Sequence, residues 1–587
     1  MNIANAPYYK KVRKRTKIFT VVLVLWTFGI FLRLLQLQVF SHARMSAQVL
    51  VQNQAKIDIF PQRGAIHDRK GSILAQSVPS LTVYYTPAAG EPLDLRMKPI
   101  LKLQPVLELS SKDIERVKTA LQNGSSHIPV KRKLELETAE MIKGLGLNGI
   151  YTREEAERLY PQGSLASHVL GSVSVDNKGQ GGVEHKFDSI LSGKKGKQIV
   201  FLDARRREYH FETIEEPQRG GDLVLTIDAT IQYIAQKELE RAVQEHSADW
   251  GTVIVSNPAS GEILAMASWP TFDPNSYPPE SKEAEPNRAI HHLFDPGSTF
   301  KIVTASAALE SRWVPMTETF DCSKGSIETA GTPIRDHKNF GVLTFPDVIS
   351  HSSNVGAIQI GRRVGPKALY QTIKTFQFGT KTGIELPAEA AGKVWPLEDW
   401  TKRSLDSVSI GYEISVTALQ MLQAMNVIAN RGILVPPRIV KDIQDVPMTQ
   451  KRSVSEPRQI ISDETARNLV SILEKAVLEG TGQEALAKGY TVAGKTGTTQ
   501  KFDPALKSYS SSKHIALFVG FVPVENPQLS MIVVLDEPKT DEYYGGQVAA
   551  PVFREIAKRV LRYLNIYPDT GSNRTIIAAN MGRKNRP

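Results

Sequence analysis

One apolar segment near the N-terminus constrains this 587-residue chain more than any other feature. Residues 18–32, IFTVVLVLWTFGIFL, carry no charge, and the hydrophobic pattern continues past Arg33. With Arg33 reaching toward the interface, residues 18–40 supply the roughly 20 positions that a membrane-spanning helix needs. Six Lys/Arg residues precede the run. The positive-inside rule therefore predicts a cytoplasmic basic segment at 1–17, a single-pass anchor at 18–40 and an exported remainder.

A cleaved signal peptide is the alternative interpretation of the same segment. It would require a small-x-small site after the apolar run, whereas LRLLQLQVF continues the hydrophobic helix. No second stretch of comparable length follows. An uncleaved anchor is therefore the better interpretation.

The net charge of +11 is concentrated at the ends of the chain. Residues 1–57 hold nine Lys/Arg and no acid, and residues 570–587 hold four Lys/Arg and no acid. The rest is close to neutral, so a body that binds nucleic acid is not expected. The single cysteine, Cys322, excludes an intramolecular disulfide.

The pattern of the exported part predicts an α+β protein with more than one domain. EEPQRGGD punctuates the chain near residue 220 and separates a mixed region, 41–220, from a second domain at 221–566 and a polar basic tail at 567–587. The second domain should begin with a helix capped by Asp228 and a hairpin, WGTVIVSNPASGEILAMAS. It should end with another hairpin, IALFVGFVPVENPQLSMIVVLDEP, and a closing helix. This arrangement predicts an antiparallel sheet built from both ends of the domain, flanked by helices, with a helical subdomain between them.

The spacing Ser-x-x-Lys occurs at Ser192, Ser298 and Ser510, which is about what chance allows in a chain of this length. Ser192 lies in a charged turn, LSGKKGK, and Ser510 in SYSSSK, which is interpreted as a polar loop before a strand. Ser298 instead follows a Pro-Gly pair and opens the apolar helix of FDPGSTFKIVTASAALES. The context therefore separates Ser298 from the other two.

A serine at a helix N-terminus next to a buried lysine has the chemistry of a nucleophile. Backbone N–H groups and the helix dipole favour negative charge at Ser298. Lys301 lies one turn later on the same face, among Phe300, Ile302 and Val303. Burial can lower the pKa of this lysine until it accepts the serine proton. Such a pair needs no histidine, so His291 and His292 are interpreted as incidental.

Two further short motifs complete a catalytic set. Of the two Lys-Thr-Gly triplets, Lys381 belongs to a turn after a helix, whereas Lys495 follows the strand-like YTVA and offers an ammonium group and hydroxyls to a carboxylate. Ser352 and Asn354 form the chain's only Ser-x-Asn, at the start of another helix. Each motif alone is weak, but Ser-x-x-Lys, Ser-x-Asn and Lys-Thr-Gly in this order are a strong joint signal for acyl transfer.

Beyond these motifs, nearly the whole chain resembles the class B penicillin-binding proteins, D,D-transpeptidases that cross-link peptidoglycan. RGAIHDRKGSILA, RLYPQGSLASHVLG and GQGGVEHKFD resemble motifs of the family's non-catalytic, dimerisation-type pedestal. GTGQEALAKGYTVAGKTGTTQ resembles the approach to its third catalytic motif. GYEISVTALQ and YYGGQVAAPVFREIA are most similar to the cell-division (FtsI) branch, with the elongation branch as the alternative. The resemblance implies an elongated pedestal at 41–220 and a β-lactamase-like transpeptidase domain at 221–566.

The resemblance also implies a role for each motif residue. Ser298 would attack the penultimate D-alanine carbonyl of a stem pentapeptide, with Lys301 as the base. Ser352 and Lys495 would pass a proton to the departing amine, while Asn354 would hold Lys301 and the substrate amide. The residues implied in substrate binding and the oxyanion hole, beside the N–H of Ser298, are Thr496, Gly497 and Thr498. The residues implied at the junction of pedestal and transpeptidase domain are Arg63, Asp68, Arg69 and Glu184.

One position departs from the Ser-Asp-Asn motif found in related enzymes, because Ser353 stands where those enzymes carry aspartate. No metal or organic cofactor is implied. The implied partners are donor and acceptor stem pentapeptides, β-lactam antibiotics, a multi-pass membrane glycan polymerase of the SEDS type and other divisome proteins. The implied location is the cytoplasmic (inner) membrane of a bacterium, with the catalytic domain outside the cytoplasm.

Three other functions are compatible with parts of the sequence. A serine β-lactamase shares the motifs, but no convincing E-x-x-L-N supplies a deacylating glutamate, and the anchor and pedestal argue against it. A D,D-carboxypeptidase differs only in using water as acceptor. A non-catalytic divisome scaffold, or activator of a glycan polymerase, would retain the fold without needing Ser298.

Overall fold

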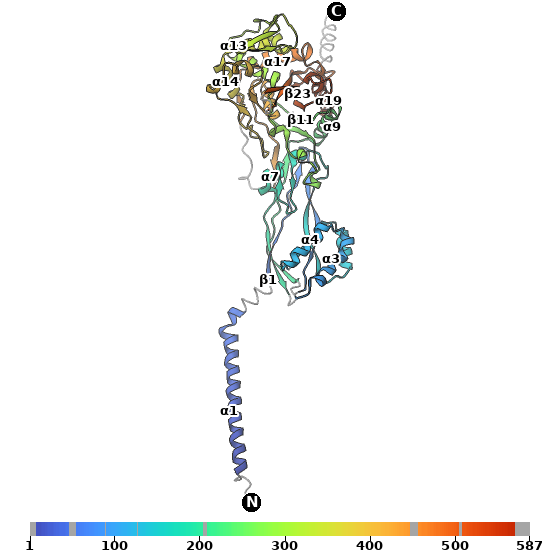
Figure 1. The fold of residues 1–587 in the computed structure, drawn as a ribbon, viewed down its shortest axis with the longest axis vertical. Helices are drawn as coiled ribbons and strands as arrows, with labels where there is room; N and C mark the ends of the chain where they lie inside the picture. The colour runs from blue at the N-terminus through green and yellow to red at the C-terminus, as the bar shows by residue number, and fades with distance from the viewer. Residues whose placement is uncertain are drawn as a thin grey trace, which may run out of the picture. The chain divides into compact units, whose positions relative to one another are not determined.

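The chain forms two compact units that interleave along the sequence (Figure 1). The computed structural model describes residues 7–45, 54–88, 90–125, 127–202, 208–445, 456–503 and 508–569. The first unit comprises residues 1–61, 79–156 and 194–218, and the second comprises 62–78, 157–193 and 219–587. Most of the predicted tail at 567–587 lies outside the described residues. Helices and strands are mixed in both units, so the predicted α+β class is confirmed.

The N-terminal helix of the first unit matches the predicted anchor. Helix α1, Pro7–Leu35, continues into a short π-helical turn, η2, Gln36–Phe40. Within the described part of the chain, Tyr8–Phe40 is the one helix long and apolar enough to cross a membrane. Its apolar side chains are exposed in the isolated chain, as expected of a segment that lipid would cover.

The rest of the first unit contains two antiparallel arrangements. Strands β1 (Gln54–Ile59), β8 (Gly196–Leu202) and β9 (Glu208–Glu215) form a three-stranded sheet. The second half of β3 (Ile73–Tyr85) pairs with β4 (Ile128–Leu134), and β5 (Ile150–Leu159) also pairs with β3. An apolar core that includes Ile100, Leu103 and Val117 lies between these strands and the helices. The helices are α3 (Leu93–Leu107), α4 (Ser111–Gln122) and α5 (Leu136–Gly144).

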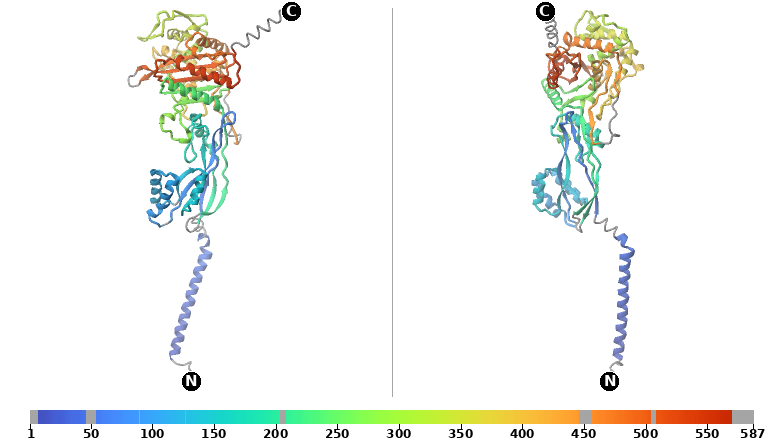
Figure 2. Two further views of the ribbon diagram at one scale, coloured as in Figure 1. Left: turned by 90° about the vertical axis from the view of Figure 1, so that its right-hand side faces the viewer. Right: turned by 180° about the vertical axis from the view of Figure 1, so that it is seen from behind.

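The second unit is organised by a five-stranded antiparallel sheet in the order β12-β11-β24-β23-β22. The strands are β11 (Trp250–Ser256), β12 (Ile263–Trp269), β22 (Ala493–Asp503), β23 (Ser508–Val522) and β24 (Leu529–Asp536). Both predicted hairpins are confirmed, and β11 pairs with β24, so the two ends of the domain share one sheet. Figure 2 shows this from two further directions, with green and red segments side by side.

Helices cover both faces of this sheet. Val533 and Phe518 point into an apolar cluster with α9 (Ala229–Glu245) and α19 (Ala550–Tyr563), while Ile532 and Leu517 point into the cluster on the opposite face. The second face is covered by α11 (Lys301–Glu310), α16 (Ala418–Ala429) and α17 (Asp463–Leu478). Asp228 caps α9 as predicted, accepting from Thr230 N at 3.0 Å. The sheet is therefore held as the middle of three layers.

The remaining elements of the second unit include short strands that the sequence does not predict. Helices are the main regular elements between residues 296 and 480, but loops are extensive, and β13 pairs with β16, β14 with β15 and β17 with β18. These strands have only two to four residues, too few to show a period-two pattern. The other elements are β2 (Ile66–His67), α6 (Ser167–Leu170), β6 (Ser172–Val173), β7 (Gly179–Gln180), α7 (Gly182–Lys186), α8 (Asp188–Leu191), β10 (Leu223–Leu225), η3 (Pro274–Ser276), η4 (Lys282–Ala284), α10 (Arg288–His291), η5 (Gly297–Phe300), β13 (Thr319–Asp321), β14 (Ser326–Thr329), β15 (Thr332–Arg335), β16 (Val342–Thr344), α12 (Phe345–Ser350), α13 (Asn354–Val364), α14 (Pro366–Thr375), β17 (Lys393–Val394), η6 (Leu397–Asp399), α15 (Ser404–Ser409), β18 (Ile414–Ser415), β19 (Ile433–Leu434), β20 (Val440–Ile443), β21 (Arg458–Gln459), η8 (Gln483–Ala485) and α18 (Gly545–Val548).

A buried ionic network holds together the N-terminal segments of the second unit. Glu184 is fully buried in α7 and accepts from Arg63 Nε at 2.6 Å and from Arg158 Nε at 2.7 Å. The hydroxyl of Tyr160 donates to the same carboxylate at 3.3 Å, and Asp188 provides a second carboxylate, which accepts from Arg63 Nη1 at 2.7 Å. Removing one member of a buried network leaves the others as uncompensated charges.

We therefore expect Glu184→Gln to lower the free energy of unfolding by about 3–5 kcal/mol, because two buried guanidinium groups lose their shared carboxylate. Denaturant unfolding of the detergent-solubilised full chain, followed by tryptophan fluorescence, measures the change. Glu240→Gln, which breaks the exposed pair with Lys237 on α9, is the matched control and should leave stability almost unchanged. Equal effects of the two substitutions would contradict the assignment.

Candidate active site

The Ser298 turn is built around a glycine in an unusual conformation. Gly297 has a φ of +51°, and its N–H donates to Gly411 O at 3.0 Å. A β-carbon at this position would lie 2.1 Å from Thr499 Cγ2, so only glycine fits between the turn and β22. The turn η5 leads directly into α11, which begins at Lys301. Ser298 is thereby half-buried at the start of a helical segment, as predicted.

Lys301 is completely buried and binds the second motif. Its Nζ donates to Ser352 O at 2.7 Å and to Asn354 Oδ1 at 2.8 Å, and lies 3.4 Å from Ser352 Oγ. Burial lowers the pKa of Lys301 to about 7, while the nearby Asp336 carboxylate acts in the opposite direction. A neutral amine has two N–H donors and one lone pair. With both donors used on the second motif, the lone pair remains to accept a proton from a serine hydroxyl.

The second motif is a strained connection between two helices. Ser352 follows α12 with a φ of +63°, a left-handed conformation that costs a residue with a side chain about 1–2 kcal/mol. Ser353 then caps α13, accepting from Gly356 N at 3.0 Å. The turn directs both the Ser352 carbonyl and the Asn354 amide oxygen at Lys301. The strained backbone of Ser352 therefore lies where the structure binds Lys301.

The third motif lies on β22, the strand beside the serine turn. Lys495 is completely buried, and burial together with the charge of Lys301 lowers its pKa well below the ordinary value. Thr498 Oγ1 accepts from Gly545 N at 2.9 Å. A β-carbon at Gly497 would lie 3.0 Å from Thr299 Cγ2, which shows how closely the strand packs on the turn.

The structure thus places the eight predicted site residues on three neighbouring segments. Lys301 contacts Ser352 and Asn354, its charge reaches Lys495, and the turn with Ser298 packs against β22, which carries Thr496, Gly497 and Thr498. Two candidates that the sequence analysis set aside as non-catalytic lie on other elements. Lys381 is exposed in the loop after α14, and Ser192 follows α8. Ser510 was expected in a loop, and this was wrong, because β23 begins at Ser508. The outer part of β23 is exposed on both faces, so no apolar alternation marks it as a strand.

The four residues predicted at the domain junction lie in the second unit, away from the three motifs. Arg63 and Glu184 form the buried ion pair described above. Asp68 Oδ2 accepts from Ala229 N at 3.2 Å, and Arg69 pairs with Glu262 at 3.2 Å. Asp68 and Arg69 thus contact segments at the start of the predicted transpeptidase domain.

Sequence reasoning missed three residues that contact the site. Asp336, which follows β15, accepts hydrogen bonds from the second motif. The hydroxyl of Thr481 is hydrogen-bonded to that of Thr496, and Gly545 contacts Thr498. Thr481 lies in GTGQEALAKGYTVAGKTGTTQ and Gly545 in YYGGQVAAPVFREIA, and the resemblance of these stretches to the family is the signal that the sequence contains for them. Asp336 lies in an exposed polar hairpin and gave none.

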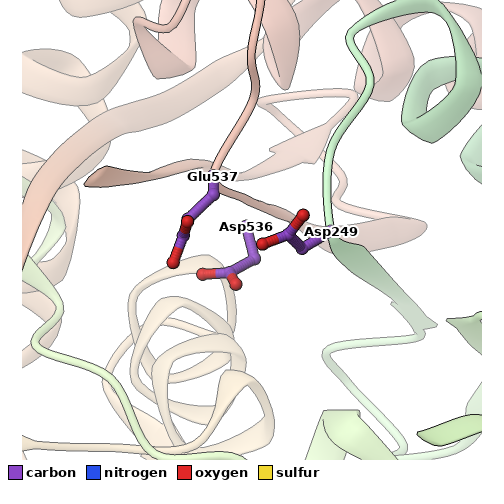
Figure 3. A group of neighbouring side chains, drawn as sticks. All are labelled: Asp249, Asp536 and Glu537. Atoms are coloured by element: carbon purple, nitrogen blue, oxygen red, sulfur yellow. The ribbon is translucent and has the colours of Figure 1, made fainter. Parts of the chain in front are cut away.

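A separate acidic group lies at the far end of the sheet and is neutralised by lysines. Oxygen atoms of Asp249, Asp536 and Glu537 lie within 4.8 Å of one another (Figure 3). Burial raises the pKa of Asp536 to about 6. Each carboxylate nevertheless has a lysine partner, and these lysines are Lys501, Lys513 and Lys539. We interpret the group as an ionic cluster that joins the end of β22 to β24.

Comparison with known proteins agrees with this geometry. Residues 251–558 match the model of the penicillin-binding protein transpeptidase domain, and residues 58–225 match the penicillin-binding protein dimerisation domain. The chain is a class B penicillin-binding protein. This penicillin-binding protein is 36% identical over 521 residues to stage V sporulation protein D of Bacillus subtilis, covering 86% of this chain and 79% of that protein. It is 33% identical over 515 residues to the peptidoglycan D,D-transpeptidase FtsI of Escherichia coli, covering 86% and 84%.

Solved structures give the same family. Penicillin-binding protein 3 of Mycobacterium tuberculosis in complex with aztreonam superposes with a TM-score of 0.67 at 28% identity. The likeness covers 87% of this penicillin-binding protein and 98% of that chain. Both the pedestal-like and the transpeptidase regions are therefore included in the match.

The lysine base predicts a pH dependence. Because the pKa of Lys301 is about 7, the amine is protonated below that pH and cannot take the serine proton. We expect the rate of Ser298 acylation by a fluorescent β-lactam to rise with pH and to reach half its plateau near pH 7. Lys301→Arg, which stays charged, should be inactive throughout. A rate that does not change between about pH 5 and about pH 9 would exclude Lys301 as the base.

Proposed function

We propose that this class B penicillin-binding protein cross-links peptidoglycan stem peptides through an acyl-enzyme on Ser298, in septal wall synthesis during cell division. The observation that carries the proposal is the hydrogen bonding of Lys301. Its buried amine donates to the Ser352 carbonyl and to Asn354 Oδ1, in the connection between α12 and α13. In its neutral form an amine held in this way keeps a lone pair, and we propose that this lone pair removes the Ser298 proton.

The proposed reaction assigns each group one step. Ser298 Oγ attacks the penultimate D-alanine carbonyl and its proton passes to Lys301 Nζ. The C–N bond then breaks, and Ser352 with Lys495 delivers a proton to the leaving D-alanine amine. The amine of a second stem peptide attacks the resulting ester, forms the cross-link and restores the Ser298 hydroxyl. Backbone N–H groups of Ser298 and Thr498 would stabilise the developing oxyanion, a contribution of about 3–4 kcal/mol in enzymes of this kind.

The electrostatics favour a donor that ends in a carboxylate. Two lysines are buried in this site, and among the described residues Asp336 is the one carboxylate that raises the pKa of Lys301, while none raises that of Lys495. An incoming carboxylate would compensate this excess positive charge, with the hydroxyls of Thr496 and Thr498 beside it. A terminal D-alanine carries such a group. β-Lactams carry one as well, so we expect them to acylate Ser298 and inhibit the enzyme.

Location and partners follow from the remaining features. The basic segment before the apolar helix supports a cytoplasmic N-terminus and a catalytic domain outside the inner membrane of a bacterium. The relatives named FtsI and stage V sporulation protein D support a role in division or a related septal process. Cross-linking needs freshly made glycan strands, so we propose a multi-pass membrane glycan polymerase and other divisome proteins as partners.

The proposal predicts which serine is acylated. Incubation of the detergent-solubilised full chain with a fluorescent penicillin should give stable labelling of the wild type and of Ser510→Ala, and none of Ser298→Ala. Ser510 has the same Ser-x-x-Lys spacing but lies in the largely exposed first part of β23, so it is a matched control. Ser298→Ala should also fail to support division in the native host.

Two other outcomes would overturn parts of the proposal. Label that appears and is then rapidly lost would indicate a hydrolase that uses water as the acceptor. An unlabelled wild type that is demonstrably folded would exclude acyl transfer and leave a scaffold.

A further inference from the structure

The carboxylate of Asp336, which lies outside the second motif, binds the central residue of that motif, Ser353. Ser353 is fully buried, and its hydroxyl donates to Asp336 Oδ2 at 2.7 Å. Asp336 comes 17 residues earlier and follows β15. In enzymes with Ser-Asp-Asn the carboxylate belongs to the motif itself. Here the motif residue is a serine, and the carboxylate comes from another segment.

The other oxygen of Asp336 binds the backbone of the same motif. Asp336 Oδ1 accepts from Asn354 N at 2.5 Å and from Val355 N at 3.1 Å. With the Ser353 hydroxyl, three donors hold this carboxylate at the start of α13. The Asn354 side chain is also tied to the same loop, because its Nδ2 donates to Arg335 O at 3.0 Å. The loop therefore fixes both the backbone and the side chain of Asn354.

These contacts lead directly to the base. Ser352 O and Asn354 Oδ1 are the two acceptors that orient the Lys301 amine, and they flank the residue that Asp336 holds. The charged groups that face Lys301 come from two elements: Asp336 and His337 from the loop after β15, and Lys495 from β22. Among these described groups, only Asp336 carries negative charge.

We propose that Asp336 is a positioning residue of the catalytic site, which holds the second motif in register with Lys301 and provides the negative charge that balances the lysine. The proposal rests on the function proposed above, since it concerns the base of that reaction. Asp336 contacts the motif and not the reacting atoms. Its effect must therefore reach the chemistry through the orientation and the protonation of Lys301.

A matched carboxylate is available as a control for helix capping alone. Asp347 lies in the first turn of α12, accepts from the Thr344 hydroxyl and pairs with Lys475 at 2.7 Å. Like Asp336 it stabilises the start of a helix in the same subdomain. Unlike Asp336, it has no hydrogen bond to residues 352–354 in the described structure.

The experiment compares Asp336→Asn, Asp347→Asn and the wild type in the detergent-solubilised full chain. Acylation by a fluorescent penicillin is measured as a function of pH, together with the thermal unfolding midpoint. Asp336→Asn should lower the plateau rate at least about 10-fold, because the amide orients the motif less well. Its acid limb should also move to lower pH, because loss of the negative charge lowers the pKa of Lys301 further. Asp347→Asn should keep the plateau within about twofold and leave the limb in place.

A second variant covers the case in which Asp336→Asn does not fold. Ser353→Ala keeps the carboxylate but removes the hydroxyl that contacts it, so the plateau should fall while the acid limb stays near its original pH. An unchanged plateau in Ser353→Ala, or an unchanged limb in a folded Asp336→Asn, would overturn the proposal. Failure of the wild type to label would instead reject the proposed function, whatever the variants do.

Discussion

The site depends on keeping two lysines out of water beside Asp336, the one carboxylate among the described residues that raises the pKa of Lys301. Burying an ammonium group without a partner is costly, and the protein responds by lowering the pKa of both Lys301 and Lys495. The surrounding structure maintains this state. The glycine turn lets β22 approach Ser298 closely, and the strained Ser352 aims its carbonyl at the amine. The resting protein therefore contains a buried lysine with a pKa of about 7, in a region that attracts anions.

The scaffold supplies the rigidity that this arrangement needs. Alternate residues of β23 and β24 enter two separate apolar clusters, so the central sheet is packed on both faces. Neither β22 nor the serine turn can then shift without disturbing a close-packed core. The buried Glu184 network has a comparable role for segments 62–78 and 157–193, which join the second unit although they lie far apart in sequence. The buried ion pairs thus link two segments that are not held together by proximity in the sequence.

The sequence predicted the elements that are determined by local interactions, such as strand alternation and helix capping. The two hairpins and the capped helix after Asp228 carry strong signals of alternation and capping, and the three motifs were recognised because each sits in a distinctive local context. The prediction for Ser510 was wrong because the first part of β23, where it lies, is largely exposed on both faces and lacks a hydrophobic period. The role of Asp336 could not be predicted, since its hydrogen bonds to the second motif form only when the loop after β15 folds against α13. The division of the pedestal region between two units is likewise a tertiary property.

The position of β22 has a consequence for antibiotic resistance. Among the described strands β22 pairs with β23 alone, so the strand with the third motif is an edge of the sheet. An edge presents backbone N–H and C=O groups, to which an extended peptide can add as a further strand. Point mutations replace side chains and leave these groups in place. An inhibitor that adds to this edge would use the same backbone groups as an extended peptide, so loss of those contacts would affect both.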